Sequence, residues 1–134
     1  MTAVLDASAL LAYLQGEKGK ERVAAAIGAG CCISSANLAE VLSKRAEAGD
    51  DPRQLASSLQ AGGLLGNGGA IEVVDLDHED AVEMAAMRSV TRSAGLSLGD
   101  RACLALARRR KSEALTTDSA WATIQVGIEI AVVR

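Results

Sequence analysis

Short apolar runs alternate along the chain with longer stretches of helical periodicity. The runs that predict strands are 2–5, 31–34, 71–74, 113–116 and 128–133. Each is short and bounded by glycines, charged residues or a change of periodicity, whereas the stretches between them are long enough for helices. This alternation is typical of a parallel sheet covered by helices, so we predict an α/β fold.

Capping and turn signals place the helices between these runs. Helices are expected over about 8–14, 18–27, 35–47, from Pro52 onward, 77–92 and 97–110, with a short one around Trp121. A proline suits the first turn of a helix, and glycines commonly close one. The glycine-rich segment 62–69 is expected to form a surface loop. Because 102–107 carries no polar face, we expect the helix that contains it to be buried against the sheet.

Composition limits the class of protein. A chain of 134 residues with 49% hydrophobic and 23% charged residues fits one domain, residues 1–134, with a single proline and one core. The three cysteines match neither a zinc-finger spacing nor a disulfide framework, which predicts reduced thiols. With no basic leader and no membrane-spanning apolar run, we expect a cytoplasmic protein without a membrane partner. The net charge of -3 disfavours broad attachment to nucleic acid but allows a local basic rim.

Four acidic residues are expected at one edge of the predicted sheet. Asp6 ends the first strand and Asp118 follows the fourth. Glu40 lies about a turn into the helix after the second strand, and Asp100 opens the buried helix. Ligands of open parallel sheets bind beyond the carboxyl ends of the strands. Crowded carboxylates suit a hard divalent cation such as Mg²⁺ or Mn²⁺, and one or two ions can activate water. The chain has one histidine, His78, and no Ser-His-acid arrangement, which disfavours covalent catalysis.

Each acid also has a simpler structural explanation. Asp6 and Asp118 can cap the helices that follow them. Glu40 can pair with a lysine one turn later, and the segment that ends at Asp100 matches a capping box. The acidic segment 75–80 is explained by the preference of helix N-termini for negative charge. Taken singly, these residues do not separate a structural from a functional role.

Four segments of the sequence resemble the motifs of a known protein family. They are VLDASALLAYL at 4–14, ISSANLAEVLSK at 33–44, LSLGDRACLALA at 96–107 and LTTDSAW at 115–121. In this order they resemble the motifs of PIN-domain nucleases, and the similarity spans essentially the whole chain. The greatest similarity is to the VapC toxins of bacterial toxin–antitoxin pairs.

The resemblance implies a fold, an activity and a set of site residues. The implied fold is a three-layer α/β/α sandwich around a parallel sheet of about five strands. The implied activity is Mg²⁺- or Mn²⁺-dependent endonucleolytic cleavage of RNA. The implied catalytic and metal-binding residues are Asp6, Glu40, Asp100 and Asp118, and the expected supporting hydrogen-bonding residues are Ser8, Asn37 and Thr117. Ser119 departs from the pattern, since many relatives carry a basic residue after the fourth acid.

The resemblance also implies partners. A toxin of this kind has an RNA substrate and a cognate antitoxin protein, and relatives form homodimers. Lys44, Arg45 and Arg101 flank the motif acids, so we expect them to be candidate contacts for RNA phosphates. Helix-surface charges of this type are as often simply solvated.

Other functions remain open from the sequence. A housekeeping RNA-processing nuclease would use the same chemistry, and a non-catalytic PIN-fold module would use the fold as a binding or regulatory surface. A haloacid-dehalogenase-type phosphatase is disfavoured because Asp6-Ala7-Ser8 lacks the second aspartate of that motif. A receiver domain would require paired acids after the first strand and a late lysine, and neither is evident.

Overall fold

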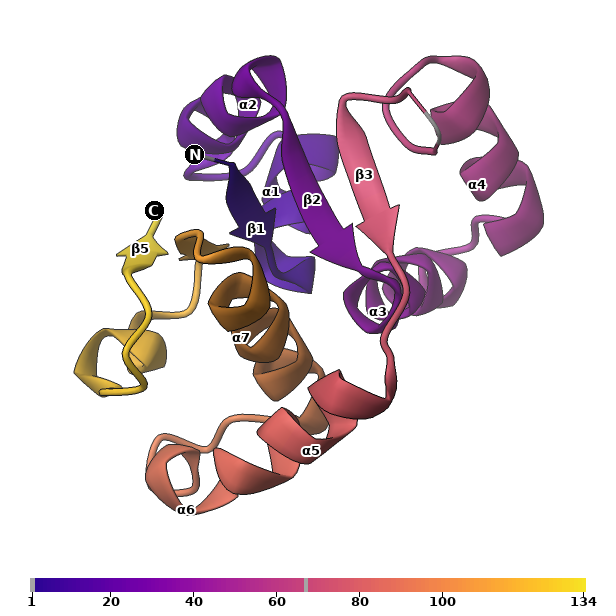
Figure 1. The fold of residues 1–134 in the computed structure, drawn as a ribbon. Coiled ribbons are helices and arrows are strands. Elements are labelled where there is room, and N and C mark those ends of the chain that lie inside the picture. Colours follow the sequence, from indigo (N-terminus) through magenta and orange to yellow (C-terminus); the bar gives the residue numbers. More distant parts are fainter. Residues whose placement is uncertain (1, 67) are drawn as a thin grey trace.

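The fold is built around a five-stranded parallel sheet. A computed structural model describes residues 2–66 and 68–134; Asn67, in the predicted glycine-rich loop, lies outside the described residues. The strand order is β3-β2-β1-β4-β5 (Figure 1). The strands are β1 (Ala3–Leu5), β2 (Cys31–Ser34), β3 (Ile71–Val74), β4 (Ala114–Thr116) and β5 (Ile130–Val132). The predicted α/β/α architecture with five parallel strands is confirmed.

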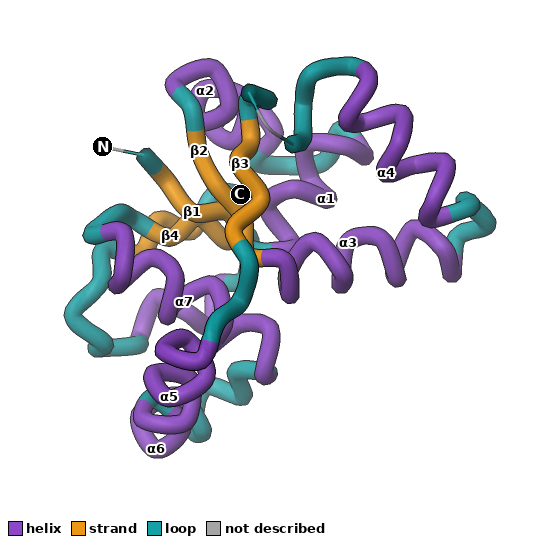
Figure 2. Tube along the Cα trace, turned by 45° about the vertical axis from the view of Figure 1, so that its right-hand side comes forward, coloured by secondary structure: helices purple, strands orange, loops and turns teal. Residues whose placement is uncertain are grey.

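Helices cover both faces of the sheet (Figures 1 and 2). The first half of the chain forms α1 (Ala7–Gln15), α2 (Lys20–Ala29), α3 (Ser35–Glu47) and α4 (Pro52–Ala61). The second half forms α5 (His78–Ala86), α6 (Arg88–Thr91), α7 (Leu98–Arg110) and the 3₁₀ helix η1 (Ser119–Thr123). These bounds agree with the predicted helices except over 77–92, where one predicted helix is interrupted at Met87. The Met87 side chain is buried there, in the same apolar cluster as the buried residues of α7.

Two apolar clusters fill the space between the sheet and its helices. Because strand side chains alternate between faces, Leu5 of β1 faces the α1 and α2 side whereas Val4 faces the α7 side. The three cysteines are free and buried in these clusters, as predicted for reduced thiols. Residues Ala102–Ala107 of α7 are all buried, which confirms the helix without a polar face.

The topology places one strand end at the point where the chain reverses its direction of winding. From β1 the chain adds β2 and then β3 on one side, and then returns to place β4 on the other side of β1. The boundary between β1 and β4 is therefore a topological switch point, the usual ligand site of such sheets. Asp6 follows β1 and Asp118 follows β4 at this boundary.

Among the residues that the structure describes, no helix is long and apolar enough to cross a bilayer.

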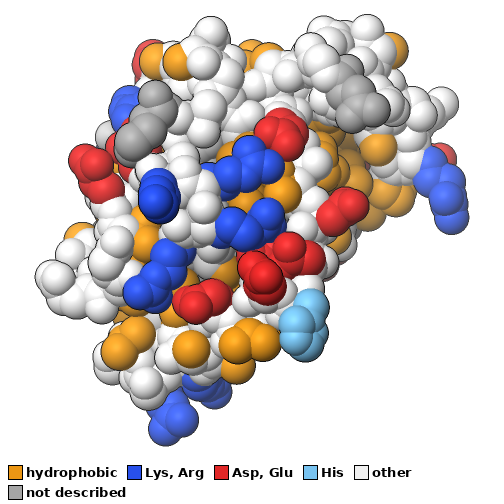
Figure 3. Space-filling model, in the orientation of Figure 1, with side chains coloured by type: hydrophobic (Ala, Val, Ile, Leu, Met, Phe, Trp, Pro, Cys, Tyr) orange, Lys and Arg blue, Asp and Glu red, His pale blue; other side chains and the backbone are white. Residues whose placement is uncertain are grey.

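Ion pairs tie the end of α7 to neighbouring elements. Arg109 binds Asp80 of α5 through two hydrogen bonds, of 3.0 and 2.8 Å, and Arg110 binds Glu72 of β3 at 3.1 Å. Figure 3 shows basic and acidic side chains side by side on this face. The Asp80 side chain is 5% exposed, whereas the Glu83 side chain of the weaker Arg108–Glu83 pair is 46% exposed. The Asp80 pair is the one shielded from water.

We expect Asp80→Asn to lower the free energy of unfolding by about 2 kcal/mol, because it leaves Arg109 without its charged partner and weakens the α5 capping box. Glu83→Gln is the control and should change stability by less than about 0.5 kcal/mol, since its pair is exposed and 3.5 Å long. Urea unfolding of both variants measures the difference. Equal losses of stability in Asp80→Asn and Glu83→Gln would contradict the claim that the buried Asp80–Arg109 pair contributes more than the exposed Arg108–Glu83 pair.

Candidate active site

The Asp6 carboxylate lies at the end of the central strand and is held from two elements. Its side chain is 3% exposed. It accepts hydrogen bonds from the Ser8 hydroxyl at 2.7 and 2.9 Å, from the Ala9 amide at 2.8 Å and from the Thr116 hydroxyl at 2.5 Å. Asp6 therefore caps α1, as its simpler explanation predicted, and also joins β1 to β4 across the switch point.

Thr116 links Asp6 to the fourth motif acid. Its hydroxyl donates to Asp6 and accepts the backbone N–H of Asp118 at 3.0 Å. The predicted supporting residue Thr117 contributes its backbone N–H, which donates to the Ser8 hydroxyl at 3.0 Å. The side-chain contact belongs to Thr116, one residue earlier, which the sequence analysis missed. Its position as the last residue of a buried strand, with a polar side chain, was the available signal.

Asp118 is exposed to solvent at this switch point. Its carboxylate accepts the Ala120 amide at 2.9 Å and so caps η1. The backbone N–H of Asp118 donates to the Thr116 hydroxyl, and the same hydroxyl donates to the Asp6 carboxylate. The fourth motif acid is thus placed beside the first, with a carboxylate that solvent reaches.

Glu40 and Asp100 come together where α3 meets α7. Asn37, one turn before Glu40 on α3, donates its amide to the Gly99 carbonyl at 2.9 Å. Asp100 follows Gly99 and forms a capping box with Ser97, in which the Ser97 N–H donates to the Asp100 carboxylate at 2.9 Å. Asn37 is fully buried, and its hydrogen bond joins α3 to the first turn of α7. The predicted supporting role of Asn37 thus corresponds to a contact in the structure.

The charge of Asp100 acts on two of the other motif acids, Asp6 and Glu40. Burial raises the pKa of Asp6 from its ordinary value of 3.8 to about 6, and the charge of Asp100 adds to the rise. Partial burial raises the pKa of Glu40, and Asp100 again contributes, while Lys44 acts in the opposite direction. Asp100 is therefore the negative charge shared by the β1 end and the α3 end of the site.

The donor chemistry fits a hydrated divalent cation. Across residues 2–66 and 68–134, no three His, Cys, Asp or Glu side chains converge into a ready-made cage. Mg²⁺ does not require one, since it usually keeps several waters and binds through one or two carboxylates. The Asn37 Oδ1 is a buried acceptor without a donor among the described residues, and metal-bound waters are donors. Acids that repel one another and an acceptor that lacks a donor both fit such an ion.

The three candidate RNA contacts lie in different environments. Lys44 is exposed and acts electrostatically on Glu40, so its charge is near the acids. Arg101 is 8% exposed and donates to the Met84 carbonyl at 2.8 Å. The expectation that Arg101 contacts RNA is thereby corrected: its long stem is buried with the apolar face of α7, and its guanidinium ties α7 to α5.

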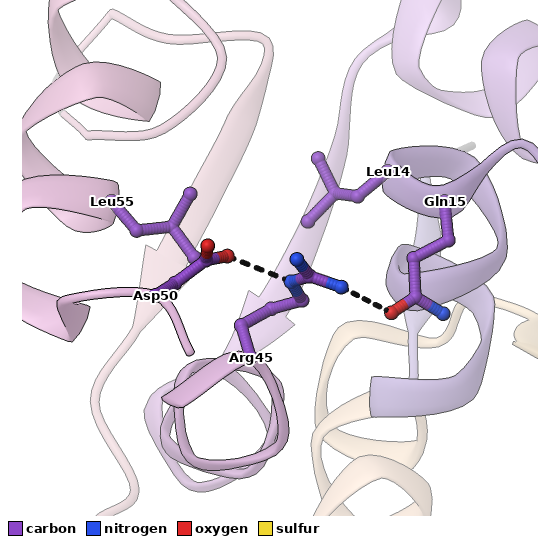
Figure 4. A pocket seen from close by; sticks show the side chains of 5 residues that line it. All are labelled: Leu14, Gln15, Arg45, Asp50 and Leu55. Atoms are coloured by element: carbon purple, nitrogen blue, oxygen red, sulfur yellow. Dashed lines mark hydrogen bonds and ion pairs between the residues drawn. The ribbon is translucent and has the colours of Figure 1, made fainter. Parts of the chain in front are cut away.

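Arg45 lies in a cavity between α1, α3 and α4 (Figure 4). It donates to Asp50 at 2.8 Å and to Gln15 at 2.9 Å. Leu14 and Leu55 complete the lining of this cavity of about 420 Å³. The Arg45 guanidinium is thus bound by Asp50 and Gln15, neither of which is a motif acid. Figure 2 shows α3 and α4, the two helices that flank this cavity together with α1.

The chain matches the model of a known protein family. The model of the PIN domain matches residues 3–126 of the chain. Among curated protein sequences none is significantly similar.

Solved structures show the same fold at low sequence identity. The DNA-bound VapBC complex of Salmonella typhimurium is 19% identical, with a TM-score of 0.69, over 98% of this chain and 97% of that one. The VapC20 toxin of Mycobacterium tuberculosis, described as cleaving the Sarcin-Ricin loop, is 14% identical, with a TM-score of 0.71, over 92% and 97%. FitAcB of Neisseria gonorrhoeae is 18% identical, with a TM-score of 0.67, over 96% of each chain.

The raised pKa of Asp6 predicts a pH dependence of stability. Between pH 3.8 and about 6 the folded state holds a proton on Asp6 that the unfolded chain has released, so the free energy of unfolding falls as the pH rises. The shift corresponds to about 3 kcal/mol. In Asp6→Asn this pH-dependent decrease in the free energy of unfolding should be absent, since an amide does not ionise.

Urea unfolding of both proteins in chelator, at pH 4 and pH 7, measures the difference. Parallel pH dependences in the two proteins would contradict the prediction.

Proposed function

Because this chain belongs to the PIN domain family, we propose that it is a divalent-metal-dependent endoribonuclease that hydrolyses phosphodiester bonds of RNA. One observation carries the proposal: the charge of Asp100, in the first turn of α7, acts both on Asp6, which follows β1, and on Glu40 of α3. Clustered acids cost stability unless a cation compensates them, so their placement is best explained by chemistry that uses one.

The side chains divide into two roles in this proposal. Asp6, Asp100 and Asp118 would hold Mg²⁺ or Mn²⁺ directly or through water. Glu40 would complete the shell or orient the attacking water, because it lies on α3 opposite Asp100. When bound, such an ion lowers the pKa of its water and neutralises charge on the scissile phosphate. Ser8 and Thr116 would keep the Asp6 carboxylate in one orientation through the hydrogen bonds described above.

Lys44 is the cation best placed to meet the RNA backbone. It is exposed, and it is near enough to Glu40 to lower the pKa of that carboxyl. Phosphate contacts of this kind position a nucleic acid without reading its sequence. The two aromatic residues of the chain, Tyr13 and Trp121, offer little for base stacking, and Trp121 is fully buried.

We propose further that the protein is the toxin of a toxin–antitoxin pair in the cytoplasm. The support is the resemblance of its four motifs to VapC toxins, and the fold it shares with chains of the VapBC complexes. In this proposal a cognate antitoxin protein silences the nuclease, and the toxin forms a homodimer. Housekeeping RNA processing by the same site is the alternative, and a non-catalytic module is the outcome if the site proves inactive.

Purified protein should cleave a mixed RNA pool with Mg²⁺ or Mn²⁺ and should not cleave it in chelator. We expect Asp100→Asn to reduce the cleavage rate by at least about 100-fold, since changes that merely disturb a metal ligand already reach that size. Asp51→Asn is the matched control: Asp51 also caps a helix, α4, but lies away from the motif acids in sequence and should leave the rate unchanged.

Circular dichroism and thermal unfolding establish that each variant is folded. Equal activity of the Asp100→Asn protein and the wild type would remove Asp100 from the mechanism. A folded wild-type protein that binds Mn²⁺ and cleaves no class of RNA would favour the non-catalytic module.

Induced expression of the wild-type chain should arrest bacterial growth, because uncontrolled RNA cleavage stops protein synthesis. Co-expression of the antitoxin should restore growth, and Asp6→Asn should abolish the arrest at equal protein levels. Colony counts and immunoblots measure these outcomes. An active nuclease whose expression leaves growth unchanged would instead indicate a housekeeping enzyme.

A further inference from the structure

Gly99 lies where the first turn of α7 packs closely against α3. A Cβ atom built on Gly99 would lie 2.5 Å from Glu40 Oε1, 3.6 Å from Glu40 Cδ and 3.7 Å from Asn37 Nδ2. Real Cβ atoms essentially never approach another heavy atom to 2.5 Å. The Glu40 carboxylate therefore occupies space that any side chain at position 99 would claim.

The backbone of Gly99 gives no separate reason for a glycine. Gly99 is in the first turn of α7 and has no positive φ, so an alanine would adopt the same conformation. Alanine is in fact preferred in a helix by up to about 1 kcal/mol. The hydrogen bond from Asn37 to the Gly99 carbonyl also holds this backbone close to α3. The reason for a glycine at position 99 is therefore steric: a side chain there would collide with the Glu40 carboxylate.

We propose that Gly99 is a positioning residue that sets where the Glu40 carboxylate lies relative to Asp100. The inference rests on the proposed function for its consequence, since Glu40 would complete the metal shell or orient water. An alanine at position 99 would displace the end of the Glu40 side chain, whose terminal torsions turn easily. The carboxylate would move, and the fold would stay.

The structural alternative is that Gly99 serves only the close packing of α3 on α7. In that case an alanine would separate the helices or destabilise them, whatever residue stands at position 40. Removal of the Glu40 side chain separates the two explanations, because Glu40→Ala leaves nothing beyond Cβ for a new methyl group to meet.

The experiment compares the wild type, Gly99→Ala, Glu40→Ala and the double variant. Gly28→Ala is the matched control, since Gly28 is an exposed helical glycine of α2 with no atom within 4 Å of an added Cβ. Three quantities are measured for each protein: the thermal unfolding midpoint in chelator, Mn²⁺ affinity by calorimetric titration, and RNA cleavage.

We expect Gly99→Ala to remain folded and to weaken Mn²⁺ affinity or cleavage about tenfold, as displaced supporting groups do. Gly28→Ala should leave both unchanged. In the Glu40→Ala protein, the further change Gly99→Ala should have no effect on either, because its target is gone. Wild-type affinity and cleavage in Gly99→Ala, an equal loss in the Glu40→Ala background, or a Gly99→Ala protein that fails to fold would each overturn the inference.

Thermal unfolding tests the contact independently of nuclease activity. Gly99→Ala should raise the midpoint of Glu40→Ala by more than it raises the midpoint of the wild type, since only the wild type must move a carboxylate. Equal rises would show that Gly99 and Glu40 do not interact. A wild-type protein that neither binds Mn²⁺ nor cleaves RNA would refute the proposed function, and this comparison would still decide whether Gly99 positions Glu40.

Discussion

The buried Asp6 carboxylate is the constraint on which the rest of the site depends. It stands at the end of the central strand, where burial opposes its charge, and two hydroxyls and one amide from α1 and β4 hold it in place. A carboxylate buried among neutral donors and close to a second acid is costly to ionise. The fold accepts that cost at its topological switch point between β1 and β4, near the contact between the N-terminal parts of α3 and α7.

The acids proposed to hold the metal also stabilise the fold. Asp6, Asp100 and Asp118 each accept a backbone N–H at the start of a helix. In a parallel α/β sheet, the carboxyl ends of the strands and the starts of the following helices share one edge. An acid that caps such a helix is therefore already placed beside the other acids, so the structural and the functional explanations of these residues do not exclude each other.

Small side chains allow this edge to be compact. The core contains few aromatic residues, and α7 places alanines at many of its buried positions. At the start of α7, Gly99 lets the helix approach α3 until the Glu40 carboxylate lies against its backbone. The distance between Glu40 and Asp100 is thus determined by the absence of a side chain, together with the hydrogen bond from Asn37.

The sequence by itself determined the strands, the helices and the order of the four acids, because periodicity, capping and the motifs are local properties. It did not show that one helix over 77–92 breaks at Met87, that the hydroxyl on Asp6 belongs to Thr116, or that Arg101 is buried. Nor did it show that the Glu40 carboxylate lies against Gly99. These features depend on contacts between segments distant in sequence, such as the 110 positions between Asp6 and Thr116. Only tertiary packing decides which such groups meet, since local patterns do not encode the approach of one element to another.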